Sequence, residues 1–323
     1  MDINSWLKQW REKAGIIYVS QPHRFAHDET KYDEQYKIDP KDIQAGKGLV
    51  SLLRRCDASF TGPALEIGCG TGRLSLGLVQ ENVYPVTLLT DPSVKFLKIV
   101  QEKMTRLSIN QNSIRYAVLS AEEIGVLPEN TFSLIALRST LHHVLDVSKF
   151  IHEAARALLP GGILTFEEPC REGFIIMGMM AQFMIPMLEA KGIGISGKHQ
   201  SQIKTFVDVM KFYSRYDVDK TSSEDKHVFR VDDVMKQGQS AGLKVEFLPN
   251  RAFDEFIYQP VSPHDRKFFN VFFKKYLSYC MSFDNELIDV LDKHFFEYFS
   301  FIEDISEGDN APYMHGVFIC IKL

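Results

Sequence analysis

Short apolar runs alternate with stretches of helical spacing along the first half of the chain. The runs have the length and composition of buried strands, and they lie at residues 64–68, 86–90, 114–119, 132–137 and 163–167. Between them apolar residues recur every three or four positions, as in 148–158, which predicts amphipathic helices. Strands that alternate with helices form parallel sheets with right-handed crossovers. The pattern therefore predicts an α/β protein with a doubly wound sheet.

The first 45 residues do not show this alternation of strand and helix patterns. A helix is expected from Asn4 or Ser5 to about Lys13, and the spacing over 40–55 predicts an amphipathic helix that leads into the first strand. The polar and aromatic stretch between them has two interpretations. It either packs on the core as a decoration or forms an N-terminal lid over a ligand site. The candidate wall residues of such a lid are Tyr18, Phe25, Tyr32 and Tyr36.

After Cys170 the alternation of strand and helix patterns is interrupted twice. Residues 171–226 predict a Met- and Phe-rich helix, a glycine-rich turn, a second helix near 202–216 and a polar linker. A capped helix and a strand at 243–248 follow, and residues 251–310 then predict two aromatic helices near 265–281 and 285–301 before a closing strand at 316–323. The expected core is thus 46–170, 227–250 and 311–323. The two insertions could be core packing, a cap with an apolar pocket, or a dimer surface.

Composition narrows the classes of partner. With 323 residues, a net charge of −5 and a pI near 6.1, the chain offers no electrostatic case for nucleic acid or for an anionic membrane. Its five cysteines are scattered, which indicates neither a disulfide framework nor a structural zinc site. The longest apolar stretch, 174–188, is shorter than a membrane span, and the N-terminus does not read as a signal peptide. A cytoplasmic protein is expected.

The stretch LEIGCGTGRLS at 65–75 carries the strongest chemical signal. It reads as a strand, a tight turn with glycine at 68, 70 and 72, and the start of a helix. Glycine accepts positive φ and lets a ligand approach the backbone, while a helix N-terminus offers free N–H groups. The dinucleotide pattern GxGxxG would need glycine where Arg73 stands, and the chain has no GxxxxGK[ST] P-loop. A different nucleotide-like ligand is therefore expected.

The spacing E-x-G-x-G-x-G closely resembles motif I of the class I S-adenosylmethionine-dependent methyltransferases. The helix-to-strand segment ALLPGGILTFEEP resembles the same family. The resemblance implies a Rossmann-like sheet of seven strands, the last antiparallel beside the sixth, with helical cap insertions after strands 5 and 6. It also implies S-adenosylmethionine as the cofactor, bound around Glu66, Gly68, Cys69, Gly70 and Gly72.

Further cofactor contacts are expected at the ends of the next strands. Asp91 ends the second strand 19 residues after Gly72, where its carboxylate can accept hydrogen bonds from both ribose hydroxyls. With Pro92 after it, Asp91 could equally cap the next helix. The resemblance implies an adenine pocket at Ser120, Ala121 and Glu122, with Ser120 in place of the family's usual Asp. Arg138 and Ser139 follow the fourth strand and are expected to face the cofactor crevice.

Methyl transfer from a sulfonium requires in-line positioning, exclusion of water and, for some acceptors, a base. A base should lie at the carboxyl edge of the fourth or fifth strand, where the candidates are His142, His143, Glu167 and Glu168. One of the two histidines is expected to be structural. Elsewhere, nothing selects His23, His27, His199 or His315. No metal is expected, because a catechol-type reaction would need acidic ligands where Arg138, Ser139 and Thr140 stand.

The sequence therefore predicts a methyltransferase that acts on the oxygen or carbon of a small, apolar or aromatic acceptor in biosynthesis. The alternative is a methyltransferase fold that binds the cofactor without transferring a methyl group. A macromolecular acceptor is disfavoured by the charge and by the absence of [DN]PP[YF] after the fourth strand, and the similar string NAPY at 310–313 lies too far downstream. A small molecule is the expected partner, with neither nucleic acid nor membrane, and the oligomeric state stays open.

Overall fold

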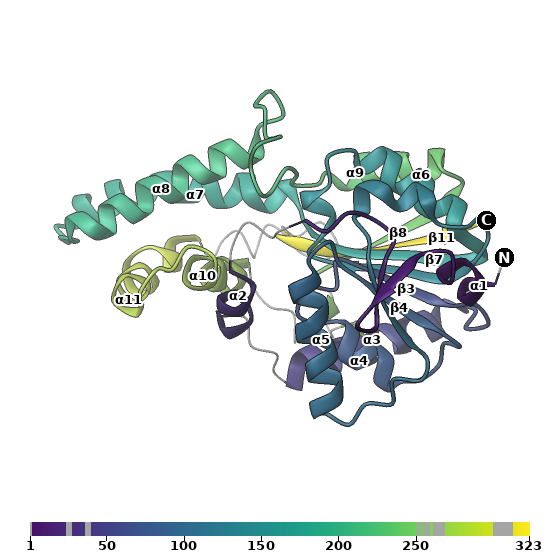
Figure 1. Ribbon diagram of the computed structural model, residues 1–323. Helices are drawn as coiled ribbons and strands as arrows, with labels where there is room; N and C mark the ends of the chain where they lie inside the picture. The colour runs from purple at the N-terminus through teal and green to yellow at the C-terminus, as the bar shows by residue number, and fades with distance from the viewer. Residues whose placement is uncertain are drawn as a thin grey trace.

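The computed structural model describes residues 2–23, 28–35, 40–250, 253–254, 259–260, 269–299 and 313–323. A single sheet of nine strands runs through the molecule in the order β1-β2-β5-β4-β3-β6-β7-β11-β8 (Figure 1). Its strands are β1 (Arg11–Lys13), β2 (Ile16–Tyr18), β3 (Ala64–Ile67), β4 (Thr87–Thr90), β5 (Ile114–Val118), β6 (Phe132–Arg138), β7 (Leu158–Pro169), β8 (Leu243–Pro249) and β11 (His315–Lys322). Two short strands, β9 (Phe253–Asp254) and β10 (Gln259–Pro260), pair separately.

The seven predicted strands are all present, and β3 to β7 run parallel to one another. The closing strand β11 lies antiparallel between β7 and β8, so that Phe318 is opposite both Phe166 and Phe247. The ring centroids of Phe166 and Phe318 are 5.0 Å apart. The predicted antiparallel insertion beside the sixth strand is therefore confirmed.

The count of seven strands is wrong, because an N-terminal hairpin adds two. The first helix, α1 (Ile3–Leu7), is capped by Asp2 and ends well before Lys13. Ala14 and Gly15, both with positive φ, then turn β1 back onto β2, which pairs in parallel with β5. The hairpin left no sequence signal because all three residues of β1 are exposed and polar. Ile16 and Ile17 of β2 are nevertheless buried against the sheet.

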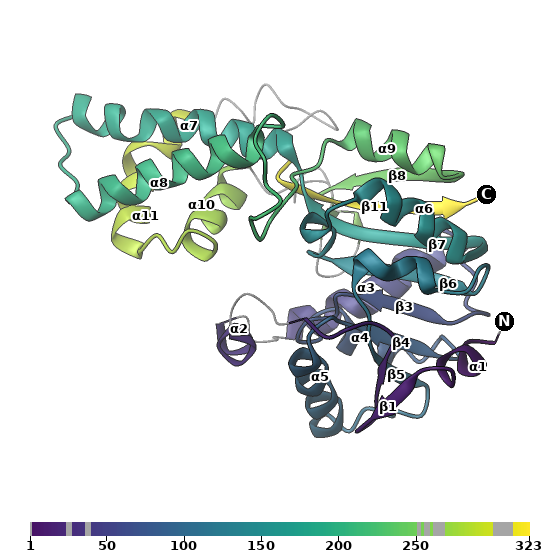
Figure 2. The ribbon, with the colours of Figure 1, turned by 45° about the horizontal axis from the view of Figure 1, so that its top comes forward.

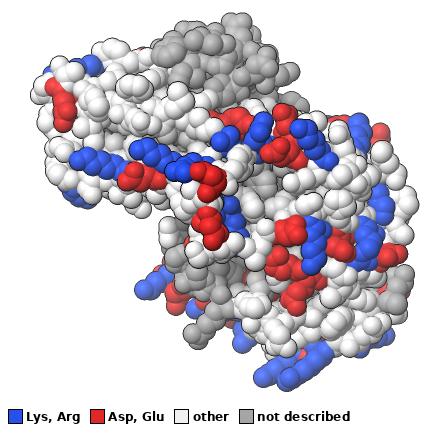
Figure 3. All heavy atoms as spheres, turned by 90° about the horizontal axis from the view of Figure 1, so that it is seen from above, with Lys and Arg blue, Asp and Glu red and all other residues white. Residues whose placement is uncertain are grey.

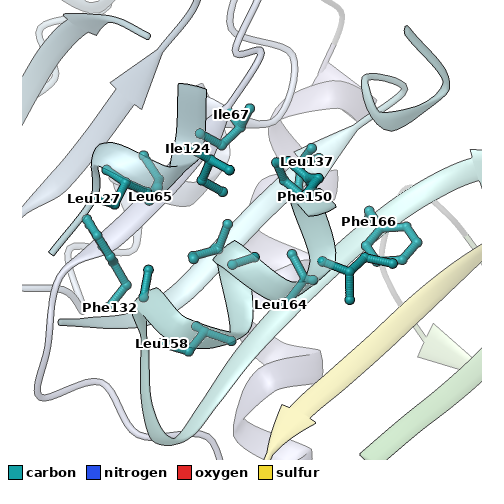
Figure 4. Packing of buried hydrophobic residues seen from close by; sticks show 14 of the residues in the cluster. Leu65, Ile67, Ile124, Leu127, Phe132, Leu137, Phe150, Leu158, Leu164 and Phe166 are labelled. Carbon is teal, nitrogen blue, oxygen red and sulfur yellow. The ribbon is translucent and has the colours of Figure 1, made fainter. Parts of the chain in front are cut away.

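Helices cover both faces of the sheet. One face carries α6 (Val147–Ala157), α9 (Val231–Ser240) and the 3-10 helix η1 (Ala121–Val126), and the other carries α3 (Pro40–Arg55), α4 (Ser75–Gln80) and α5 (Val94–Arg106) (Figure 1). Figure 4 shows the first of these cores, in which Leu65 and Ile67 of β3 pack with Phe150 of α6. The predicted doubly wound arrangement is confirmed.

The PGG segment before the fifth predicted strand belongs to the strand itself. β7 already begins at Leu158, which pairs with Phe132, and the register to β6 shifts before Leu134 pairs with Ile163. The extra residues are accommodated because Gly161 has a φ of 73° and because a Cβ there would contact nothing within 4 Å. The expected strand start at Ile163 is thus wrong. The glycines form a bulge rather than a turn that precedes the strand.

The helices of both insertions share a second apolar core. It is built from α7 (Arg171–Ala190), α8 (Gly197–Ser214), α10 (Phe269–Tyr279), α11 (Asn285–His294) and η4 (Phe296–Phe299). Figure 2 shows these helices together, beyond the end of the sheet at which β7 runs into α7. Met177, Phe206 and Phe273 are fully buried there. This helical layer, called the cap below, faces the edge of the sheet at which the parallel strands end.

Helix α7 is longer than the apolar stretch from which it was predicted. It spans 20 residues, with a mean hydropathy of 1.5 over its most apolar window. Among the described helices it alone is long and apolar enough to cross a membrane by length and composition, while 44% of that window is buried within the protein. A Cβ on Gly178 would lie 2.9 Å from Met210 of α8, so this glycine lets the two helices pack closely.

A buried ion network ties α3 to the ends of the central strands. Asp42, only 2% exposed, lies 2.9 Å from Arg73 and 3.4 Å from Arg138, and Arg138 lies 3.3 Å from Glu167. Removing one member of a buried network leaves uncompensated charge. The Asp42 carboxylate therefore holds the cationic side chains of the glycine turn and of β6 in place.

Asp42→Asn is accordingly expected to lower the free energy of unfolding by about 3 kcal/mol in urea titrations. The matched control is Glu81→Gln, which breaks the exposed pair with Arg54 at 3.4 Å and should cost less than about 0.5 kcal/mol. Equal losses in the two variants would show that the Asp42 network contributes no more than a surface pair.

Candidate functional site

The glycine turn joins β3 to α4, and its three glycines differ in what surrounds them. Gly68, Gly70 and Gly72 all have positive φ, of 69°, 50° and 93°. A Cβ on Gly68 would lie 2.4 Å from Thr140 Cγ2, so the residue must be glycine for packing. A Cβ on Gly70 would meet nothing within 4 Å. Gly70 therefore borders open space, as a turn that receives a ligand requires.

Asp91 lies beside this turn at the end of β4. Its side chain is buried, with Oδ2 accepting a hydrogen bond of 2.9 Å from the Gly70 amide and Oδ1 one of 2.8 Å from the Ser93 amide. A carboxylate has about four acceptor sites, so each oxygen keeps one for a ligand hydroxyl. The alternative helix-cap role is wrong for Asp91, since Ser93 caps α5. The carbonyl of the neighbouring Pro92 accepts the His23 amide at 3.0 Å.

Burial raises the pKa of Asp91 to about 7, although the two amides that donate to it act in the opposite direction. Ribose hydroxyls that donate to the carboxylate favour its ionised form, so binding lowers this pKa and releases a proton. The affinity for S-adenosylhomocysteine is therefore expected to fall by up to about tenfold per pH unit below pH 7, and to level off above it. Calorimetry in buffers of different ionisation enthalpy measures the proton release. An affinity that rises on acidification would contradict this assignment.

Glu66 and Cys69 are buried residues whose hydrogen bonds hold the glycine turn in place. Glu66 is 1% exposed, its Oε2 accepts the Ser75 hydroxyl at 2.7 Å, and burial raises its pKa to about 8. The Cys69 amide donates to the Thr90 carbonyl at 2.9 Å, which joins the turn to β4. Both side chains are buried. They therefore position the glycine backbone and the start of α4.

The residues expected to contact adenine lie directly after β5. Ser120 caps η1, and its amide donates to Ser20 Oγ at 3.2 Å. Ala121 is the first residue of η1, and Glu122 Oε1 accepts the Leu145 amide at 2.6 Å. The N-terminal segment thus reaches these residues through Ser20, a contact that the sequence did not indicate.

Of the four residues predicted to line a lid, one lies in the sheet, one lies in a helix, and two lie outside the described residues. Tyr18 belongs to β2 and pairs with Val118, so it is a sheet residue. Tyr32 belongs to α2 (Glu29–Gln35) and packs on Phe96 of α5 with ring centroids 5.5 Å apart. In the same helix Glu29 accepts the Ser93 hydroxyl at 2.9 Å, which places α2 beside the start of α5. Phe25, His27 and Tyr36 lie outside the described residues, as do positions 310–312 of the NAPY string.

Glu168 organises the turn that follows β6. Its Oε1 accepts the amides of Thr140 at 3.0 Å and Leu141 at 2.6 Å, and its Oε2 lies 2.5 Å from His142 Nδ1. The turn begins at Ser139, whose φ is 50°, and continues as η2 (Leu141–His143). The sequence raised Glu168 only as a candidate base. Glu168 lies near the end of β7, beside the end of β6, and its carboxylate can therefore accept the amides of the turn that follows β6.

Glu167 points to the other side of β7, because side chains alternate along a strand. It lies 3.3 Å from Arg138 in the network of Asp42, not beside the histidines. The structure therefore brings Glu168, rather than Glu167, together with His142. Ser139 donates its amide to the Glu167 carbonyl at 3.0 Å, so it contributes backbone geometry to this edge.

His142 and His143 meet an acid from the cap insertion. Asp225 Oδ1 lies 3.5 Å from His142 Nε2 and 3.4 Å from His143 Nδ1, and His143 Nδ1 is also 3.0 Å from the Glu224 carbonyl. Burial lowers the pKa of His142, but the charge and the hydrogen bond of Glu168, together with the nearby Asp225 and Glu224 charges, outweigh burial and raise this pKa above its usual value. Burial and the neighbouring His142 lower the pKa of His143. Asp225 was not predicted from sequence, because it stands in a stretch with the composition of a linker.

The backbone of the segment that carries Asp225 is hydrogen-bonded to η2. The amides of Lys226 and His227 donate to the His142 carbonyl at 2.8 and 3.2 Å. His227 Nε2 lies 2.8 Å from the Val144 carbonyl. These contacts hold the end of the first insertion against η2.

Aromatic and thiol groups of the cap lie near enough to Asp225 for its charge to affect them. Burial and the Asp225 charge raise the pKa of Tyr213 to about 12 and that of Cys280 to about 11, and they also raise the pKa of Tyr276. These residues come from α8, α10 and the turn after it. Of the remaining histidines, His199 lies 3.2 Å from Asp284 within the cap, and His315 is opposite Pro169 in β11. The edge between sheet and cap thus combines imidazole, carboxylate and aromatic groups.

Charge on the face seen in Figure 3 is mixed. Acidic and basic residues are interspersed over the sheet region and the border of the cap, and no continuous basic patch forms among the described residues on this face. A surface of this kind gives no electrostatic footprint for nucleic acid.

Residues 65–166 match the family described as Methyltransferase domain. A ubiquinone biosynthesis O-methyltransferase of Rhizobium etli is 29% identical over 148 residues, which cover 46% of this chain and 52% of that protein. The ubiquinone/menaquinone biosynthesis C-methyltransferase UbiE of Rickettsia massiliae is 30% identical over 118 residues, covering 34% and 46%. The match thus spans about half the length of these relatives.

Among solved structures, a protein of Galdieria sulphuraria provisionally named a sarcosine dimethylglycine methyltransferase superposes with a TM-score of 0.51. The identity is 15%, and the superposition covers 91% of this chain and 97% of that one. At this identity the likeness concerns the fold.

Proposed function

We propose that this chain, in which residues 65–166 match a methyltransferase domain, transfers a methyl group from S-adenosylmethionine to a small, apolar or aromatic acceptor. The single observation that carries this proposal is the juxtaposition of two features at one edge of the sheet. The open glycine turn at Gly70 with the Asp91 carboxylate lies at this edge, and the Glu168–His142 pair stands at the ends of the neighbouring strands.

The residues around the glycine turn fit the cofactor. Gly70 offers space that a Cβ would fill, and Asp91 keeps one acceptor site on each oxygen for a pair of vicinal hydroxyls. The resemblance to the family assigns Ser120 and Glu122 to the adenine, and both lie at the start of η1, directly after β5. When bound, the cofactor supplies an electrophilic methyl group on a sulfonium.

The chain's own contribution is to position the acceptor and to exclude water. The Thr140–His143 turn is held rigid by the two amides that donate to Glu168 and by the cap segment bound to the His142 carbonyl. Glu167 and Glu168 are engaged with Arg138 and with the turn. His142 and His143 are thus the groups of this edge that we propose to handle the acceptor's proton.

The acceptor class follows from what faces this edge. Tyr213, Tyr276 and the apolar cap would accommodate a ring or an alkyl chain better than a charged macromolecule. The two relatives named above carry O- and C-methyltransferase names in quinone biosynthesis, which supports an oxygen or a carbon acceptor in a biosynthetic step.

The test uses the full chain, S-adenosylmethionine labelled in its methyl group, and cell extract separated into lipid, small-molecule, protein and nucleic-acid fractions. Label is expected in a lipid or small-molecule product. Label confined to protein or nucleic acid would overturn the small-acceptor proposal. Cofactor binding without label in any fraction would favour a fold that binds the cofactor without transfer.

Glu168→Gln is expected to lower the turnover rate by about 100-fold, because it removes the charge that orients His142 and changes one of the turn's acceptors. The affinity for S-adenosylhomocysteine should stay within about threefold, since Asp91 and Gly70 are untouched. Glu153→Gln on the surface of α6 is the matched control and should retain wild-type turnover. A Glu168 variant with full turnover would show that this carboxylate does not position the reaction.

A further inference from the structure

Three ligand-type atoms converge where the cap segment meets η2. One ligand atom from each of His142, His143 and Asp225 lies within 4.8 Å of the others, and Asp225 Oδ1 faces His142 Nε2 and His143 Nδ1. The carboxylate oxygen is 3.5 Å from the first and 3.4 Å from the second. These separations are longer than the roughly 2.7–3.2 Å typical of N–H···O hydrogen bonds, so hydrogen bonding alone does not explain the cluster well.

The same separations fit a shared metal ion. For bonds of about 2.1 Å at the tetrahedral angle, two ligand atoms of one metal lie about 3.4 Å apart. Two imidazoles and one carboxylate make up the three-ligand set of catalytic zinc sites, which keep a further position for water or substrate. The side chains are 13%, 35% and 44% exposed, so an ion can reach them.

Glu168 supplies the support that metal-bound histidines usually have. Its Oε2 lies 2.5 Å from His142 Nδ1, so the imidazole donates from Nδ1 and Nε2 is left as the ligand atom. Such a carboxylate–histidine pair fixes the tautomer and raises the basicity of the ligand. Since Glu168 also accepts the Thr140 and Leu141 amides, the backbone that carries both histidines is fixed as well.

The third ligand is positioned by backbone contacts on both sides of Asp225. The Lys226 and His227 amides bind the His142 carbonyl, which holds the segment after Asp225. The Glu224 carbonyl, before Asp225, faces His143 Nδ1 at 3.0 Å. A metal ion would replace the proton that Nδ1 shares with this carbonyl.

A second cluster in the cap provides a contrast. His199, Asp284 and Glu286 also lie close together. There, however, Lys198 Nζ is 2.8 Å from Asp284, and Asp284 caps α11 through the Leu287 amide. That carboxylate is already neutralised and occupied, so its contacts explain it without an ion.

We propose that His142, His143 and Asp225 bind one divalent transition metal ion of the zinc type. Imidazole ligands favour zinc, cobalt or iron over magnesium and calcium. The site rests on the proposed function only for its role. A bound metal would hold an acceptor oxygen and lower the pKa of its hydroxyl, whose proton would pass to solvent water before methylation, so the two histidines would act as ligands instead of taking the proton themselves. This proposal departs from the sequence-based expectation of no metal, because Asp225 comes from the insertion and not from the residues after the fourth strand.

The test titrates Co²⁺ into the untagged, chelator-treated full chain. One equivalent should bind and give a visible d–d absorption band, Zn²⁺ should displace it, and Mg²⁺ should not. Asp225→Ala is expected to weaken Co²⁺ binding by at least about tenfold, and His143→Gln serves as a second variant. Asp219→Ala, an exposed acid of the same segment, is the matched control and should bind as wild type does.

Absence of stoichiometric Co²⁺ binding, or unchanged binding in both ligand variants, would overturn the metal site. Calorimetry with S-adenosylhomocysteine on the same samples reports the fold and the cofactor site separately. A wild-type chain that binds Co²⁺ but not S-adenosylhomocysteine would count against the proposed function and leave the metal site standing. The reverse result would remove the metal site alone.

Discussion

Replacing Asp91 by alanine is expected to weaken the binding of S-adenosylhomocysteine by about 100-fold or more in calorimetric titrations. Each hydrogen bond to a charged acceptor contributes about 1.5–3 kcal/mol, and the variant removes the carboxylate that we propose accepts both ribose hydroxyls. The buried carboxylate also joins the Gly70 amide to the start of α5, so its loss loosens the turn that the ligand approaches. The expected effect is therefore larger than that of a single lost contact.

Asp208→Ala is the matched control for this variant. Asp208 lies on the surface of α8, 3.9 Å from Lys211, and its side chain is 80% exposed. The control should bind S-adenosylhomocysteine as wild type does. An Asp91 variant within about threefold of the control would contradict the ribose assignment.

Gly70→Val is expected to abolish detectable cofactor binding while leaving the chain folded. A Cβ at this position meets no protein atom within 4 Å, so the new side chain would occupy only the open space bordering the turn. The substitution also forces a β-branched residue into positive φ, which costs about 1–2 kcal/mol of stability. Circular dichroism on heating measures that cost separately from binding.

Gly161→Val is the control that separates the effect of backbone strain on stability from the effect of filling the space beside the glycine turn. Gly161 has a φ of 73°, and a Cβ added to it would likewise meet no atom within 4 Å, but it lies in the bulge at the start of β7, at the opposite end of the sheet. The two variants should lose similar stability, and only Gly70→Val should lose the cofactor. Retained affinity in Gly70→Val would show that the ligand does not approach this turn.

The geometry of the glycine turn and the position of Asp91 beside it could be predicted from sequence because the signals for them are local. The glycines at 68, 70 and 72, the apolar strand before them and Asp91 after the next strand lie within short segments whose geometry is set by backbone conformation. The positions of the seven predicted strands along the chain could be predicted for the same reason. Each strand and each helix has its own spacing of apolar residues.

The parts that sequence reasoning missed depend on contacts between distant segments. The hairpin of β1 and β2 carries an exposed first strand, and its second strand is too short to differ from a loop pattern. Asp225 meets His142 and His143 only because the insertion returns to the sheet beside η2. The choice between Glu167 and Glu168 depends on which face of β7 each side chain occupies. The bulge at Gly161 shifts the register between β7 and β6, and this shift leaves no signal in the sequence.

A crystal structure of the full chain with S-adenosylhomocysteine tests the central claim most directly. The account predicts both ribose hydroxyls within hydrogen-bond distance of the Asp91 carboxylate, the ligand backbone over Gly70, and the sulfur directed toward the Thr140–His143 turn under the cap. A ligand bound elsewhere, or a sulfur directed away from that turn, would contradict it.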